Sequence, residues 1–100
     1  TKNISFNHSL KLIEKKVTIV NKAGMHTRPA SAIVRIAAKY KADFFISKNG
    51  FEVNGKSIIG VMTLAAEQGS TLELIFDGED ETDLADAMIK FFEDGFGEPK

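Results

Sequence analysis

Four short runs of this chain are typical of strands, and in two of them apolar and polar residues alternate. In KKVTIVN, Val17 and Ile19 share one face of a first strand. The runs DFFISK and FEVNG stand on either side of Asn49–Gly50, a dipeptide typical of a two-residue hairpin turn. A further strand, TLELIF, places three large apolar side chains on one face: Leu72, Leu74 and Phe76.

Three other segments repeat their apolar residues at helical spacing. The first begins at Pro29, a residue suited to the first helical position, and has this apolar face: Ala30, Ile33, Val34, Ala37 and Ala38. In SIIGVMTLAAEQG, Ser57 is the expected N-cap, Gly69 the expected stop, and the face is Ile58, Val61, Met62 and Ala65. The last helix follows acidic residues that suit its N-terminus, and carries this stripe before Gly95: Leu84, Ala87, Met88, Phe91 and Phe92.

The resulting order, β-α-β-β-α-β-α, predicts an α+β domain. Two short βαβ-like units joined by a hairpin favour a four-stranded antiparallel sheet with three helices on one face. Element order by itself leaves ferredoxin-like relatives open. Residues 1–14 show no clear period, and we expect an N-terminal extension that is partly disordered, followed by one domain over residues 15–97.

Composition narrows the functional classes. With 13 basic and 14 acidic residues and a net charge of −1, the chain is not built to bind nucleic acid by neutralising phosphates. It contains no cysteine, which excludes disulfides and cysteine-based metal sites. No apolar run reaches the roughly 20 residues of a membrane-spanning helix, and no signal peptide is evident. We therefore expect a cytoplasmic protein that is not inserted in a membrane.

The candidate chemistry lies in GMHTRPA, where His26 stands at an expected helix start. Unpaired backbone N–H groups and the helix dipole attract anions there, phosphate above all, and disfavour a protonated imidazole. A neutral ring that attacks phosphorus would leave its phosphoryl group beside these amides, with Arg28 as a charged donor. On position alone, a solvated surface histidine is the competing interpretation.

Other residues give weaker signals. His8 lies in the irregular extension, where a solvated side chain is the expected role, and two widely spaced histidines do not predict a metal site or a cofactor. No carboxylate pair or Ser/His/Asp arrangement indicates a hydrolase. A metabolite-binding module and a pure interaction domain, in which His26 is incidental, remain as alternatives.

Two motifs together resemble one family. AGMHTRPA is similar to the active-site motif of HPr, the histidine phosphocarrier of the bacterial phosphoenolpyruvate:sugar phosphotransferase system. GKSIIGVMTL resembles that family's second signature, and the two motifs stand at the separation that the family requires. The resemblance covers Lys15 to Gly97 and implies an open-faced β-sandwich.

The resemblance also implies roles for individual residues. His26 corresponds to the histidine phosphorylated on Nδ1, and Arg28 to the arginine that contacts the phosphoryl group, with backbone N–H groups of Thr27 and Arg28 binding its oxygens. Ser57 corresponds to a serine modified by a kinase in many bacteria, as well as being an N-cap. Such a protein is a phosphorylated intermediate rather than a catalyst that turns over by itself.

The partners implied are other proteins. They are enzyme I, enzyme IIA domains of sugar transport, and for some members HPr kinase/phosphorylase and a transcriptional regulator. Ile58, Ile59 and Met62 are three large apolar residues in a short helix, so we expect them to form an exposed docking surface on a monomer. An HPr-like relay for nitrogen-related or catabolite control, without sugar transport, is the alternative. Regulatory-only relatives lack the histidine that is present here, which favours a working carrier.

Overall fold

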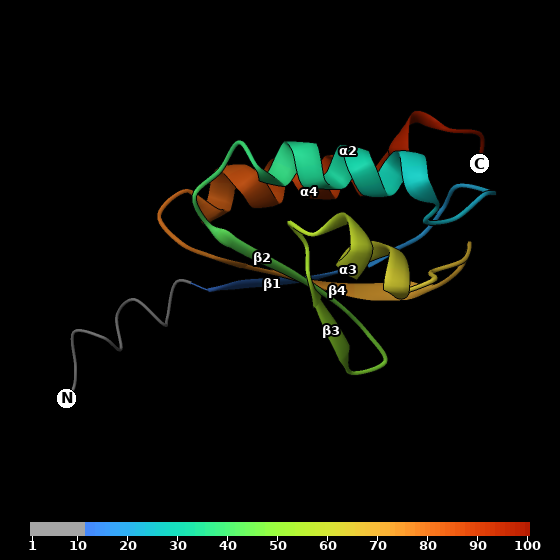
Figure 1. Cartoon of the computed structure of the whole chain (residues 1–100). Helices are drawn as coiled ribbons and strands as arrows, with labels where there is room; N and C mark the ends of the chain where they lie inside the picture. Colours follow the sequence, from blue (N-terminus) through green and yellow to red (C-terminus); the bar gives the residue numbers. More distant parts are fainter. Residues whose placement is uncertain (1–11) are drawn as a thin grey trace.

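The computed structural model describes residues 12–100 and has the expected order of elements (Figure 1). In chain order these are β1 (Ile13–Thr18), α2 (Thr27–Ala37), β2 (Asp43–Lys48), β3 (Phe51–Asn54), α3 (Ile58–Thr63), β4 (Thr71–Asp77), α4 (Glu81–Glu93) and a final 3-10 turn, η1 (Gly95–Gly97). The strand β1 begins inside the range assigned to the extension, because Ile13 pairs with Phe76 of β4. Most of the expected extension, with His8, lies outside the described residues.

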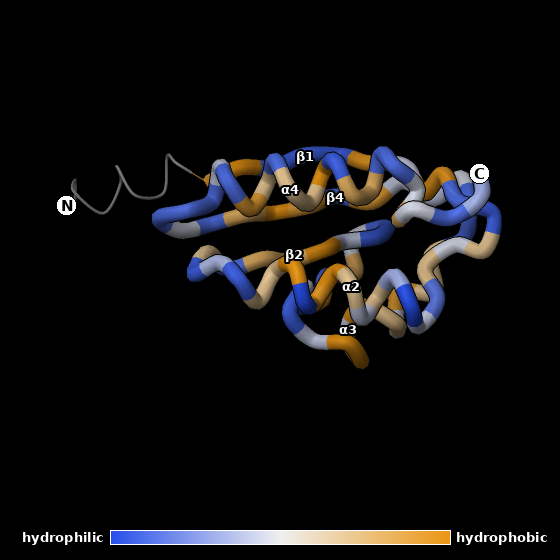
Figure 2. The backbone as a smooth tube through the Cα atoms, turned by 90° about the horizontal axis from the view of Figure 1, so that it is seen from above, coloured by the Kyte–Doolittle hydropathy of each residue, from blue (hydrophilic) through white to orange (hydrophobic). Residues whose placement is uncertain are grey.

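The strands form one antiparallel sheet in the order β1-β4-β2-β3, which confirms the predicted α+β open-faced sandwich. Viewed from above, α4 runs over β1 and β4, α2 lies beside it on the β2 side, and α3 follows beyond α2 (Figure 2). The core therefore lies between the helices and one face of the sheet. Phe44 and Phe76 stack there on neighbouring strands, with ring centroids 5.0 Å apart.

Two helices differ from their predicted ends. The helix α2 begins at Thr27, so that Pro29 is its third residue, a position that also lies within the first turn and needs no N–H. Its expected apolar residue Ala38 is the exposed C-cap. The helix α3 ends at Thr63, well before Gly69, because Ala65 takes a left-handed backbone conformation (φ 47°) that stops the helix.

Two expected apolar positions, one on α3 and one on α4, are not fully buried. Ala65 is exposed instead of lying on the apolar face of α3. On α4, Ala87 was expected in the apolar stripe but is only half-buried, whereas Ala85 is buried.

Within residues 12–100, no helix has both the length and the apolar character needed to cross a membrane.

Candidate functional site

The backbone around His26 is fixed by the loop that follows α3. Gly24 has a φ of +71°, and a Cβ atom there would lie 2.7 Å from the carbonyl oxygen of Ala66. The next residue, Met25, is buried and donates its N–H to the same oxygen over 2.8 Å. A glycine is therefore required at this close approach, and His26 follows from an anchored position.

His26 is the N-cap of α2, but its ring does not cap the helix. Its backbone is extended, and its carbonyl oxygen accepts the N–H of Ala30 over 3.1 Å. The ring instead places Nε2 2.9 and 2.8 Å from the two carboxylate oxygens of Glu98. Because a carboxylate only accepts hydrogen bonds, Nε2 is the donor in this contact, and in the neutral form of the ring the lone pair is therefore on Nδ1.

The Glu98 carboxylate accepts hydrogen bonds from three residues of one short segment: Asn21, His26 and Arg28. Oε1 also accepts from Nδ2 of buried Asn21 over 2.8 Å, and Oε2 accepts from Nε of Arg28 over 2.8 Å. The hydrogen bond from His26 lowers the pKa of Glu98 most, and those from Asn21 and Arg28 add to it, so that this pKa falls to about 2. The carboxylate is therefore ionised throughout the neutral range, although only 10% of the side chain is exposed.

After α4 the chain turns back in a hook formed by residues 95–100, which brings Glu98 to the His26 ring. Gly95, Phe96 and Gly97 all have positive φ, and the buried Phe96 ring packs edge-on against Phe92, with centroids 5.0 Å apart. A non-glycine residue with positive φ is unfavourable unless packing enforces it, as the Phe96 ring does here. Beyond Glu98, the carbonyl of Pro99 accepts the N–H of Lys22 over 2.9 Å.

The structure brings Arg28 to the same carboxylate as His26. Its side chain is 59% exposed, and it also donates from Nη2 to the carbonyl oxygen of Phe96 over 3.2 Å. Thr27 and Arg28 follow His26 directly and begin α2, so their N–H groups have no intrahelical partner. These groups, with a neutral imidazole, can receive a phosphoryl group on Nδ1.

Ser57 caps α3 as predicted. Its backbone is extended, and its Oγ accepts the N–H of Gly60 over 3.1 Å. A Cβ on Gly60 would come within 3.3 Å of the carbonyl oxygen of Asn54, so a close contact within the fold favours glycine here.

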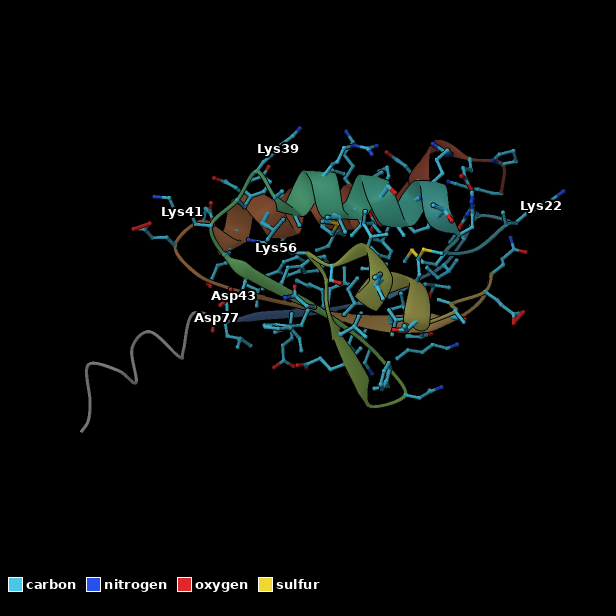
Figure 3. The ribbon with its side chains drawn as sticks, viewed as in Figure 1. Lys22, Lys39, Lys41, Asp43, Lys56 and Asp77 are labelled. Atoms are coloured by element: carbon cyan, nitrogen blue, oxygen red, sulfur yellow. The ribbon has the colours of Figure 1, made fainter. Side chains whose placement is uncertain are left out.

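One apolar surface joins the two motifs. Ile58, Ile59 and Met62 are exposed, Ile59 by 78%, whereas Val61 of the same helix is fully buried. The Thr27 hydroxyl lies 4.0 Å from Sδ of Met62, so the start of α2 and this part of α3 share one face. Lys22 points outward at this end of the molecule, near the start of α2 (Figure 3).

The sequence pattern did not predict that Asn21 and Glu98 take part in this site. It also indicated no metal site. Glu98 is 72 residues from His26, and its only local signal is the glycine-rich string DGFGEP around it. Over residues 12–100, no group of three or more histidine and acidic side chains is placed to hold a metal ion.

Comparisons with known proteins agree on one family. The family model described as "PTS HPr component phosphorylation site" matches residues 13–94. The phosphocarrier protein HPr of Xylella fastidiosa is 40% identical over 87 residues, which cover 87% of this chain and 98% of that protein. The HPr-like protein Crh of Halalkalibacterium halodurans is 43% identical over 82 residues, covering 82% of this chain and 98% of that protein.

Solved structures give the same result. A crystal structure of HPr from Thermoanaerobacter tengcongensis matches with a TM-score of 0.84 and 36% identity, covering 88% of this chain and 99% of that one. A structure of an HPr dimer from the same organism matches with a TM-score of 0.70 and 38% identity, covering 82% and 94% of the two chains.

Proposed function

This chain belongs to the HPr family, and we propose that it accepts a phosphoryl group on Nδ1 of His26 from phospho-enzyme I and passes it to enzyme IIA components of sugar transport. The observation that carries the proposal is the ring contact with Glu98, which engages Nε2 and leaves Nδ1 as the ring nitrogen available for phosphotransfer at the N-terminus of α2. Such a site accepts one phosphoryl group and later donates it. The protein is then a phosphorylated intermediate and not a catalyst that turns over by itself.

The chemical step is a transfer between two proteins. The lone pair of Nδ1 attacks phosphorus, and the bond from phosphorus to the donor breaks with its electron pair staying on the donor. The phosphoryl oxygens then lie within reach of the N–H groups of Thr27 and Arg28 and of the Arg28 guanidinium, which offset their charge. Transfer to the next partner reverses these events.

Incubation with phosphoenolpyruvate and enzyme I, followed by intact-mass measurement, tests this proposal. We expect one acid-labile, base-stable phosphoryl group on the wild type and on His8→Ala, and none on His26→Ala. A phosphoryl group that persists in His26→Ala, or its absence from the wild type, would overturn the proposal.

We further propose that partners dock on Ile58, Ile59 and Met62, and that phosphorylation of Ser57 blocks this docking. A phosphate adds about −1.5 to −2 charges at pH 7, and a helix N-terminus tolerates that charge, so the fold stays intact. The same charge would have to lose water where a partner meets Ile58 and Met62. HPr kinase/phosphorylase would make the modification, and a transcriptional regulator would be a reader of the modified form.

Rates of phosphotransfer from enzyme I to phosphoserine-57 protein, Ser57→Asp and Ser57→Ala test this regulation. We expect inhibition by orders of magnitude for phosphoserine, partial inhibition for Ser57→Asp, which has less charge, and near-normal rates for Ser57→Ala. Equal rates for phosphoserine and unmodified protein would end the regulatory proposal.

A regulatory relay for nitrogen-related or catabolite control is the second candidate, because the chain is 43% identical to an HPr-like protein Crh. If it applies, phosphorylated His26 or Ser57 signals to a regulator, and no enzyme IIA accepts the phosphoryl group. Transfer from phosphorylated protein to enzyme IIA domains distinguishes the two functions. The carrier is proposed to act as a cytoplasmic monomer, and sedimentation at working concentration tests the monomer against the dimer described for a relative.

A further inference from the structure

Within the hook, residues 95–100, Glu98 contacts the ring nitrogen of His26 that the proposed phosphotransfer does not use. Glu98 reaches Nε2 of His26, while the proposed reactive atom is Nδ1. The contact is held from several sides: Phe96 is anchored in the core, Pro99 accepts the N–H of Lys22, and Gln68 donates to the carbonyl oxygen of Lys100 over 3.3 Å. Such a fixed contact can act on the chemistry of the ring.

We propose that Glu98 is a positioning residue that holds the Nε2 proton of His26 before and after phosphotransfer. Before transfer it keeps the lone pair on Nδ1, and after transfer it faces the positive charge of the phosphorylated imidazolium. The proposal rests on the proposed function, because it assigns Glu98 a part in the phosphorylation of His26.

The proton at Nε2 does not move during this step. When Nδ1 donates its lone pair to phosphorus, the ring becomes a cation that still carries hydrogen on Nε2. When the phosphoryl group leaves, the electrons of the N–P bond return to the ring, which departs as neutral imidazole. Without hydrogen on Nε2 the ring would have to leave as an imidazolate anion, a far poorer leaving group, so a carboxylate that retains this hydrogen favours onward transfer.

Asn21 supports the contact at a cost to its own hydrogen bonding. Its side-chain N–H₂ donates both to Oε1 of Glu98 and to the carbonyl oxygen of Gly24, over 2.8 and 2.9 Å. Its own oxygen Oδ1 is buried without a hydrogen-bond partner among residues 12–100. A buried acceptor is left unsatisfied only where another requirement fixes the group, and here that requirement is a donor aimed at the carboxylate.

The charged groups around the ring come from several elements. Arg28 of α2 shares the carboxylate with His26, Lys22 of the preceding loop points outward (Figure 3), and Lys100 lies beside Gly95. In the loop after α3, Glu67 is exposed, and α3 itself contains no titratable side chain. Glu98 is thus the carboxylate in contact with Nε2, and Arg28 is the cation that a phosphoryl group on Nδ1 can share with it.

Three variants separate the hydrogen bond from the charge. Glu98→Ala removes both, Glu98→Gln keeps an oxygen that can accept the Nε2 hydrogen but lacks the charge, and Glu93→Ala removes an exposed acid on α4 as the matched control. The first readout is the ¹⁵N and ¹H NMR signal of the Nε2–H group in unphosphorylated protein. The second is the rate of hydrolysis of phospho-His26 against pH, in protein whose Phe96 ring signals show that the hook is intact.

We expect a protected Nε2–H signal in the wild type, Glu93→Ala and Glu98→Gln, and its loss by exchange with water in Glu98→Ala. The hydrolysis rate falls as pH rises and Nε2 loses its proton, and this fall should occur about one pH unit lower in Glu98→Ala and Glu98→Gln. Above the higher of the two midpoints, hydrolysis in these variants is then about tenfold slower than in the wild type.

Unchanged N–H signals and an unchanged hydrolysis profile in Glu98→Ala would overturn the proposal. A profile that shifts equally in Glu93→Ala would do the same, because a distant acid would then have the effect. If no form accepts a phosphoryl group, the wild type included, the proposed function fails instead. The N–H signal still decides then whether Glu98 holds the ring.

Discussion

Arg28 donates to the Glu98 carboxylate and to a backbone carbonyl, yet most of its side chain is exposed. Contacts made at the surface contribute little to folding, whereas a guanidinium beside a phosphoryl group stabilises the charge that transfer creates. We therefore expect Arg28 to contribute to phosphotransfer more than to the stability of the fold.

Arg28→Ala should slow phosphotransfer strongly and lower the free energy of unfolding by no more than about 1 kcal/mol. Arg35→Ala is the matched control, because Arg35 is an exposed arginine in the last turn of the same helix. Transfer assays and urea denaturation measure the two effects. A normal transfer rate combined with lost stability would show that Arg28 is structural.

Glu98 makes stability depend on pH in a defined direction. Its pKa is lowered from 4.5 to about 2, so the ionised form stabilises the folded state. This contribution is complete above about pH 4.5 and disappears as the pH falls towards about 2. We expect the wild type to exceed Glu98→Gln in free energy of unfolding at pH 7, and the difference to shrink between pH 4.5 and 2.

Denaturation of both proteins across this pH range checks that expectation, with Glu93→Gln as the control that shows no such trend. A gap between wild type and Glu98→Gln that is constant with pH would contradict the low pKa of Glu98.

The sequence identified single residues only where their role is local. Ser57 was predicted as an N-cap because a cap acts on an N–H three residues ahead. His26 and Arg28 stood beside a predictable helix start. Glu98 was not predicted, because its contact depends on consecutive positive φ angles at Gly95, Phe96 and Gly97, and alternation of apolar residues does not record those.

For whole strands and helices, the sequence pattern predicted buried faces better than it predicted where an element ends. Alternation predicted the inward residues Leu72, Leu74 and Phe76 of β4, which are buried. The end of α3 was predicted wrongly, since Ala65 gives no signal of a left-handed conformation and Gly69 is the more typical stop. Residue preference alone did not locate that end.

The cap of α3 has a measurable contribution. Ser57→Ala should lower the free energy of unfolding by about 1 kcal/mol, because it leaves the Gly60 N–H without its side-chain acceptor. Ser57→Asp keeps an acceptor at the same place and should lose much less. Thermal melts followed by circular dichroism test the pair, and equal losses in both variants would show that capping is not what Ser57 contributes.

At the scale of the whole molecule, α2 and α3 present His26 and the proposed docking surface on one face. Ile59→Ser should change the free energy of unfolding by less than about 0.5 kcal/mol, because Ile59 is 78% exposed. It should nevertheless slow transfer from enzyme I when the carrier is limiting. Leu12→Ser, at an exposed apolar residue just before β1, serves as the control. An unaltered rate in Ile59→Ser would remove Ile59 from the docking surface.

The central claim is that the fold leaves Nδ1 of His26, and not Nε2, free to take the phosphoryl group. NMR of phosphorylated protein with ¹⁵N-labelled histidine tests it most directly, because one-bond coupling between phosphorus and nitrogen identifies the bonded atom. We predict coupling to Nδ1 of His26, with hydrogen still on Nε2. Coupling to Nε2, or a phosphoryl group on any other residue, would contradict the claim.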